Sequence, residues 1–313
     1  MTKRMGWAIA LTIAAMGSGC VAEMGSPHDE LEDGPPYDDD LEVGLAVEAL
    51  TSDIEFTWSQ GQPEQWLMPE ADGICMLTGV GGKFRGGGER VQVEVDPIHR
   101  WWRLTGTSSQ TGVSARARCL RWSEFSGLGA GRRVLGRFGY TDHGYGGDGY
   151  PFWEYRTCDF VGSNVAVSDQ HSTFCWLSSM SGLFEGGAEN VHVRVHDDRN
   201  WRVGAQNCTE EPFVDAGAMC ADFGLGLRSA WYTPERTWRQ GEAPVDLGSV
   251  TGSVCGLTHV GGRFSGAGES VWITQRDGRW WLEGHSLSAG VEARARCVWR
   301  TQSLTTPIII TPL

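Results

Sequence analysis

The sequence predicts an all-β protein made of three tandem disulfide-stapled antiparallel β-repeats of about 65–70 residues each. Three observations support this fold class. A set of cysteine, phenylalanine and glutamate recurs three times, short segments alternate apolar and polar residues, and no long segment has apolar residues at helical spacing. The 44 glycines and 15 tryptophans also suit short strands joined by many turns.

The recurring set begins at a cysteine. In each copy a phenylalanine follows that cysteine by nine residues, and a glutamate follows it by fourteen. The three copies are Cys75, Phe84 and Glu89; Cys175, Phe184 and Glu189; and Cys255, Phe264 and Glu269. Each copy ends at a second cysteine, which follows Ala-Arg-Ala-Arg in the first and third copies and Ala-Gly-Ala-Met in the second.

Eight cysteines follow the first one, and eight cysteines allow 105 pairings. The repeat selects three bonds with separations of 44, 45 and 42 residues, namely Cys75–Cys119, Cys175–Cys220 and Cys255–Cys297. Cys158 and Cys208 remain for a fourth bond. Cys158 lies 17 residues before the first cysteine of its copy, as Trp58 and Trp238 do in theirs, so we expect it to replace a packed tryptophan. The even number of cysteines fits an oxidising compartment.

Alternating segments follow the glutamate of each copy and predict half-buried strands. Val91, Val93 and Val95 alternate with polar residues, and the other two copies hold the same pattern. The glycine-rich segments 85–88 and 265–268 are expected to form turns or bulges with positive φ. Each unit is thus a meander of roughly five strands. The three units either stand in a row or close around a pseudo-threefold axis.

The first 20 residues have the layout of a signal peptide, with a basic start, an apolar run over residues 7–16 and small residues before Cys20. The ending Met16-Gly17-Ser18-Gly19-Cys20 resembles a bacterial lipobox, although Gly17 stands where leucine is usual. The resemblance implies an exported protein with a lipid on Cys20, anchored to the cell envelope at the outer membrane or surface. The alternative is cleavage after Ala22 and plain secretion.

The net charge of −13 is concentrated near the N-terminus. Residues 23–50 carry ten acids and no lysine or arginine, while residues 1–22 carry two cations, which leaves −5 for residues 51–313. Such an acidic stretch is typical of a disordered tether. The sequence shows no basic face, so nucleic acid is not an expected partner, and the membrane is expected only through the lipid anchor.

The chain is therefore expected to contain seven segments: a signal peptide with a lipobox-like end at 1–20, an acidic tether at 21–50, β-repeat 1 at 51–122, a glycine-rich insertion at 123–152, β-repeat 2 at 153–226, β-repeat 3 at 227–300 and a tail at 301–313.

The inserted loop is the first candidate for a ligand site. Its aromatic faces and short polar side chains on a glycine-rich backbone are the mixture that sugar sites use. The candidate residues are Tyr140, Asp142, His143, Tyr145, Asp148, Tyr150 and Trp153. The alternative is a glycine-rich loop without a ligand. No metal or cofactor is expected, because the cysteines lack zinc spacing and His192 and His196 lie about 13 Å apart along a strand.

The repeated glutamates and tryptophans favour structural roles. The glutamates are expected to cap turns or to pair with the arginines before the last cysteine, but the middle copy keeps Glu189 and lacks those arginines. Tryptophans that recur are expected in the core: Trp58, Trp238, Trp101, Trp201 and Trp280 or Trp281. Tryptophans found in one copy are candidates for a surface: Trp66, Trp153, Trp176, Trp231 and Trp272.

No nucleophile elbow, zinc-protease motif, phosphate loop or Cys/His pair occurs, so the protein is not expected to be an enzyme. The pattern Cys…Gly-Gly-x-Phe…Glu…Ala-Arg-Ala-Arg-Cys resembles modules of uncharacterised secreted and adhesin-like proteins of high-GC bacteria, and this resemblance implies no activity.

We expect a cell-surface or secreted binding module, lectin-like toward a glycan or polysaccharide, with equivalent exposed pockets in two or three units. A structural or protein-interaction protein of the cell envelope is the second hypothesis, and it predicts shared cores beneath unlike surfaces. A hydrolase with a hidden carboxylate pair is the third.

Overall fold

A computed structural model describes residues 54–124, 133–142, 165–169, 173–196, 199–206, 214–222, 232–251, 253–288 and 290–299, with the backbone alone for 133–142 and 165–169. These residues belong to one compact unit that spans residues 49–313. They form 18 strands and no α-helix, and the strands build three six-stranded antiparallel sheets. The predicted all-β fold class is confirmed.

Each third of the folded chain contributes six strands. The first unit has β1 (Glu55–Ser59), β2 (Gln65–Pro69), β3 (Gly73–Gly81), β4 (Arg85–Val95), β5 (Trp101–Thr107) and β6 (Ser114–Arg121), with 3₁₀ turns η1 (Glu70–Asp72) and η2 (Trp122–Glu124). The second has β7 (Arg133–Asp142), β8 (Val165–Asp169), β9 (Thr173–Leu183), β10 (Asn190–Val195), β11 (Asn200–Gln206) and β12 (Val214–Asp222). The third has β13 (Arg236–Arg239), β14 (Val245–Ser249), β15 (Ser253–Gly261), β16 (Ser270–Arg276), β17 (Arg279–His285) and β18 (Glu292–Trp299).

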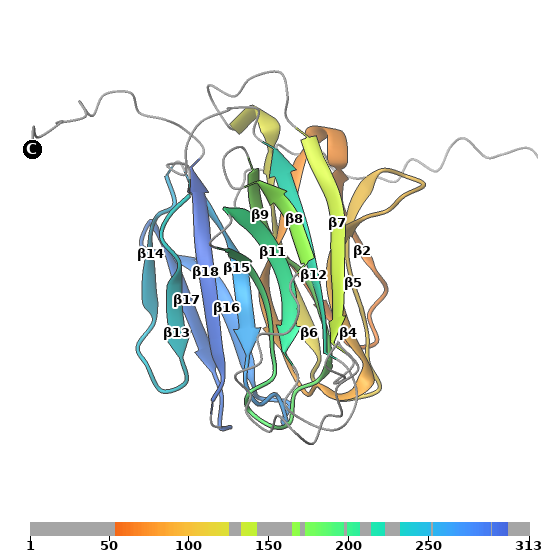
Figure 1. The fold of residues 1–313 in the computed structure, drawn as a ribbon, viewed down its shortest axis with the longest axis vertical. Coiled ribbons are helices and arrows are strands. Elements are labelled where there is room, and N and C mark those ends of the chain that lie inside the picture. Colours follow the sequence, from red (N-terminus) through yellow and green to blue (C-terminus); the bar gives the residue numbers. More distant parts are fainter. Residues whose placement is uncertain are drawn as a thin grey trace, which may run out of the picture. The chain divides into compact units, whose positions relative to one another are not determined.

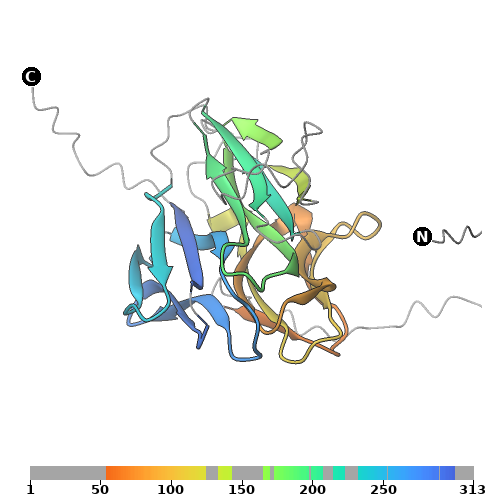
Figure 2. The same ribbon diagram turned by 60° about the horizontal axis from the view of Figure 1, so that its bottom comes forward.

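Every sheet is shared between two units. Sheet A has the order β1-β6-β3-β16-β17-β14, sheet B has β2-β5-β4-β9-β12-β7, and sheet C has β13-β18-β15-β10-β11-β8. The joins between units are the pairs β3–β16, β4–β9 and β10–β15, which we call the seams. The first, second and third units, coloured orange to yellow, green and blue, therefore surround a common centre, and their strands run along it (Figures 1 and 2). Of the two arrangements left open by the sequence, the structure has the closed one.

The three repeated phenylalanines meet at this centre. The rings of Phe84, Phe184 and Phe264 are fully buried and pack edge to face, with centroids 6.0 to 6.1 Å apart for every pair. Their backbones form a closed ring of hydrogen bonds. Phe84 N–H donates to Phe264 at 2.9 Å, Phe184 to Phe84 at 2.9 Å, and Phe264 to Phe184 at 2.8 Å. The shared Cys-x₈-Phe spacing thus brings one residue per unit to a pseudo-threefold axis.

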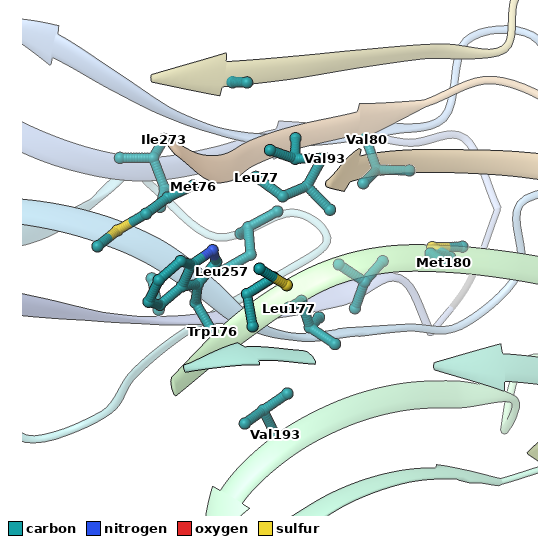
Figure 3. Packing of buried hydrophobic residues seen from close by; sticks show 14 of the residues in the cluster. Met76, Leu77, Val80, Val93, Trp176, Leu177, Met180, Val193, Leu257 and Ile273 are labelled. Carbon is teal, nitrogen blue, oxygen red and sulfur yellow. The ribbon is translucent and has the colours of Figure 1, made fainter. Parts of the chain in front are cut away.

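Side chains of different size complement one another around the same axis. The residues that follow the first cysteine of each copy are Met76, Trp176 and Gly256. A Cβ atom on Gly256 would lie 3.1 Å from the Trp176 Cβ and 3.2 Å from the Met76 sulfur, so the indole and the thioether fill the space that glycine leaves. Leu177 and Leu257 pack beside them from two different units (Figure 3). Trp176 is fully buried, so its interpretation as a surface residue is wrong.

The three disulfides predicted from the repeat are present. Cys75–Cys119, Cys175–Cys220 and Cys255–Cys297 each join directly opposed residues of neighbouring strands in one unit. Such bonds indicate an extracellular or otherwise oxidising environment. Cys158 and Cys208, the predicted fourth pair, lie outside the described residues.

The recurrent tryptophans occupy the core, with one change of residue. Trp58 and Trp238 are buried as expected. In the mid-repeat class the equivalent residues are Trp102, Trp201 and Trp280, whose indole N–H groups donate to backbone carbonyls at 3.0, 3.0 and 3.2 Å. The prediction that Trp101 is the core tryptophan of the first copy is therefore wrong, because Trp101 points to the opposite face of β5 from the buried Trp102.

The second unit begins earlier than expected. Strand β7 lies inside the predicted insertion 123–152 and pairs with β12, with Tyr140 opposite Ala216. Trp58 and Trp238 stand opposite the equivalent alanines Ala115 and Ala293, so Tyr140 takes the tryptophan position that we had predicted for Cys158. The insertion therefore follows the first strand of the unit instead of preceding it, which a count of residues back from Cys175 could not detect.

The glycine-rich segments differ in detail from the prediction. Positive φ occurs at Gly82, Gly182 and Gly262, two residues before each phenylalanine, with values of 101°, 112° and 97°. Among the described residues of 85–88 and 265–268, φ is not positive. Gly86 and Gly266 serve a different purpose, since a Cβ atom there would lie 2.9 and 2.6 Å from a carboxylate oxygen of Glu89 and Glu269.

A glycine beneath each buried tryptophan makes the packing of that tryptophan testable. A Cβ atom on Gly106 would lie 2.5 Å from Trp58, and the same holds for Gly284 and Trp238. We expect Gly106→Ala to lower the free energy of unfolding by about 2 kcal/mol or more through overpacking, measured by chemical denaturation with disulfides intact. The second unit has Ala205 at the position equivalent to Gly106 and Tyr140 at the strand register of Trp58, so adding Trp58→Tyr should restore part of the loss.

The matched control is Gly88→Ala, because a Cβ atom there meets nothing within 4 Å. Equal destabilisation by Gly88→Ala and Gly106→Ala would contradict this account of the tryptophan site.

Candidate functional site

The predicted ligand loop is described only at its start. Tyr140 and Asp142 belong to β7, where their backbones pair with Ala216 and Val214. The other candidates lie outside the described residues: His143, Tyr145, Asp148, Tyr150 and Trp153. Tyr140 stands at the strand register that Trp58 and Trp238 hold in the other two units.

The repeated glutamates are buried beside their glycine loops, and Glu189 binds its own loop directly. Glu189 is fully buried, and its carboxylate accepts the backbone N–H groups of Gly186, Gly187 and Ala188 at 2.9, 2.7 and 3.2 Å. Glu89 and Glu269 are buried at the same place and accept serine hydroxyls at 3.2 and 2.8 Å. The contacts of Glu189 support the turn-capping interpretation that the sequence favoured.

The repeated arginines have partners other than those glutamates. Arg116 and Arg118 lie 3.2 and 2.9 Å from the carboxylate of Glu55, and Arg294 and Arg296 lie 3.6 and 3.7 Å from that of Glu235. The pairing of these arginines with the repeated glutamates, one of the two roles considered from the sequence, is therefore wrong. The guanidinium of Arg118 also lies over the Trp280 ring at 5.2 Å, so it crosses the seam of sheet A.

The outer face of sheet A carries two tryptophans. Trp272 of β16 and Trp281 of β17 are half-buried, and Arg116 and Arg276 stack on them at 5.2 and 5.0 Å. Glu283 accepts the Trp272 indole N–H at 3.0 Å and pairs with Arg276 at 3.0 Å. Trp272 was a surface candidate from the sequence. Trp281 was not among the surface candidates. The Trp-Trp pair at 280–281 could have indicated it, because successive strand residues point to opposite faces and only one of the two can enter the core.

The outer face of sheet C carries a histidine pair at its seam. His192 and His259 stand opposite each other on β10 and β15, with stacked rings whose centroids are 6.3 Å apart. Burial, together with the nearby Arg194, lowers the pKa of His192 to about 3. Burial also lowers the pKa of His259, whose Nε2 lies 3.0 Å from Glu292. Both rings are therefore neutral at pH 7.

The outer face of sheet B is different again. Trp66 on the edge strand β2 is 42% exposed and meets His99 edge to face at 5.3 Å. Arg103, opposite Trp66 on β5, pairs with Glu64 at 2.8 Å and Glu94 at 2.7 Å.

Other sites have little support in the described ranges. A cavity of about 20 Å³ next to Ile54, Leu67 and Glu124 holds no more than about one water molecule. No group of three or more His, Cys, Asp or Glu side chains among the described residues could hold a metal ion. That same part of the chain has no helix with the length and apolarity needed to cross a membrane.

The capping role of Glu189 predicts a loss of stability without a role in binding. Glu189→Gln replaces one accepting oxygen by an NH₂ group that faces N–H donors, so we expect a loss of about 2–3 kcal/mol in unfolding free energy, measured by denaturation. The control is Glu185→Gln in the same loop. It removes an ion pair with the exposed Arg85 and should cost under about 1 kcal/mol. Equal effects would rule out capping.

The histidine seam predicts a dependence of stability on pH. The folded pKa of His192 is about 3 and its ordinary value is 6.5, so the unfolded chain binds the extra proton as the pH falls between these values. This stabilisation is complete above pH 6.5 and is lost on acidification. Between pH 6.5 and 4.5 we expect His192 to account for about 2 kcal/mol of lost stability.

The comparison variant for this measurement is His192→Gln, because Gln92 stands at the equivalent position of the first unit. Its unfolding free energy, measured by urea denaturation at each pH, should fall less steeply than that of the wild type. Parallel pH profiles would show that His192 does not contribute. The hydrogen bond with His259 lowers the pKa of Glu292 to about 2. The stabilisation from Glu292 is therefore lost mainly at pH values below the range of 6.5 to 4.5 used for His192.

Comparison with known proteins identified no relative of this chain. No protein-family model, no curated protein and no solved structure matches the chain.

Proposed function

We propose that this protein is an exported binding module of the bacterial cell envelope, lectin-like toward a glycan or polysaccharide, and that it has no catalytic activity. We further propose that a lipid on Cys20 anchors it and that the acidic segment 21–50 holds the folded part away from the membrane. The disulfides support the exported location, because they belong to an oxidising environment.

One observation supports binding over catalysis most directly. The residues that the three units share are buried and serve the fold, as the phenylalanine, glutamate, cysteine and tryptophan positions illustrate. Some outward positions keep the same residue in two units, such as Arg116 and Arg294, but the outward residues at the seams differ in all three units. At the seams these are Gln92, His192 and Trp272. A constant scaffold with variable outer faces is the arrangement by which many binding proteins present one specific surface.

The same observation favours one binding face over three equivalent pockets. Repetition was expected to give multivalency, but the partly exposed tryptophans of the described residues occur at positions that are not equivalent between units. We therefore propose that the repetition builds the scaffold and that a single face binds the ligand.

The second candidate is a protein-interaction role in the envelope, and the unlike outer faces of the three sheets favour it as well. A protein ligand would not need the stacking geometry that a sugar needs. The two functions are distinguished by whether the protein binds a glycan or another protein.

Glycan binding can be tested with the exported, disulfide-intact protein. We expect selective binding to a subset of an array of glycans and bacterial polysaccharides. Binding measured in solution with monomeric protein should show preference for the same sugars. The control is protein unfolded by reduction, which should bind none of them. A folded, oxidised sample that binds no sugar would contradict the lectin-like function and leave the protein-interaction role.

A further inference from the structure

We infer that the outer face of sheet A, around Trp272 and Trp281, is the binding platform and that its ligand is a neutral polysaccharide. This inference rests on the proposed glycan-binding function and names the site and the class of ligand. Its support comes from the position of the two indoles, the residues at equivalent positions, and the charge around them.

The two tryptophans form a diagonal pair on one face of the sheet. Trp272 stands opposite Glu283, and Trp281 lies two residues before Glu283 on the same strand, so both side chains lie on the same face. Diagonal neighbours across antiparallel strands have Cα atoms about 7–8 Å apart. Two flat aromatic groups at this spacing offer a surface on which the apolar faces of linked sugar rings can stack.

The fold does not require either tryptophan. The residues equivalent to Trp272 in the other two units are Gln92 and His192, and those equivalent to Trp281 are Arg103 and Arg202. Those sheets have the same strand order without a tryptophan at either of these two positions. Partly exposed indoles that the scaffold can omit are better explained by a ligand than by folding.

The polar groups around the indoles are held in place and balanced in charge. Arg116 pairs with Glu55, and Arg276 pairs with Glu283, so each stacked guanidinium already has a carboxylate partner. An anionic polymer would have to break these pairs. The hydroxyls of a neutral sugar can instead use the remaining donors and acceptors of the same planar groups. The charge balance therefore favours a neutral polysaccharide.

The platform is complete only in the closed structure. Trp272, Trp281 and Arg276 come from the third unit. Arg116 comes from the first unit, where it pairs with Glu55, and it reaches Trp272 across the β3–β16 seam. A single unit could not assemble this face.

The test uses affinity electrophoresis of the full, oxidised protein in gels that contain laminarin, galactomannan or xyloglucan, with polygalacturonate as the anionic comparison. The variants are Trp272→Gln and Trp281→Arg, which introduce residues that the other units hold at these positions and should therefore fold. We expect at least one neutral polysaccharide to retard the wild type, and each variant to raise the dissociation constant tenfold or more. Trp272→Tyr should retain part of the affinity.

The matched control is Trp66→Ala, which removes an exposed tryptophan from sheet B and should change the dissociation constant less than twofold. Sugar binding that is unaffected by both sheet A variants would overturn the platform while leaving the proposed function intact. Binding to polygalacturonate alone would overturn the neutral class of ligand. Failure of the folded protein to bind any polysaccharide would overturn the proposed function together with this inference.

Discussion

The ring of three phenylalanines is the constraint on which the rest of the structure depends. Each backbone N–H of Phe84, Phe184 and Phe264 is satisfied by the next member of the ring, and each aromatic ring packs on the other two. A buried N–H without a partner is costly, so no member can leave without exposing its neighbours. The strand pairing follows from this closure, because units that meet at one axis place their central strands beside those of the next unit.

Sharing of sheets makes the three units one cooperative structure. Each seam supplies strand pairing that no unit can provide alone, and guanidiniums such as that of Arg118 reach over the core tryptophan of another unit. A unit of about 65–70 residues has a size at which a single hydrophobic core gives only marginal stability. The disulfides tie strands within a unit, and the seams tie the units together.

Much of the interior could be predicted from the sequence because the repeat gives three views of each position. The disulfide pairing, the burial of Trp58 and the structural role of Glu189 followed from residues that recur at fixed spacing. The errors arose where copies differ in length or where neighbours compete. Because the connection after β7 is longer in the second unit, counting back from Cys175 assigned Cys158 to the wrong position. Trp101 and Trp102 are neighbours on one strand, and only the pairing register decides which of them is buried.

The outer faces were harder to predict because no repeat constrains them. Trp281 is indistinguishable in sequence from its buried neighbour Trp280, and its exposure follows from the pairing of β17 with β16. Arg116, which stacks on Trp272, comes from a different unit more than 150 residues away in the chain, so no local pattern indicates this contact. Closure around an axis is likewise a property of pairing between units, which spacing within a unit does not encode.

The sharing of sheet A between the first and last units has a consequence for biogenesis. In the export that we propose, the chain crosses a membrane from its N-terminus and delivers β1, β3 and β6 first, so their sheet stays half-built until β16 emerges. The open edge of β3 is meanwhile a site where wrong strands can pair. Cys75 and Cys119 lie in the part already delivered, so oxidation can fix that half-sheet in its final register while it waits. Covalent order within units thus precedes the closure that joins them.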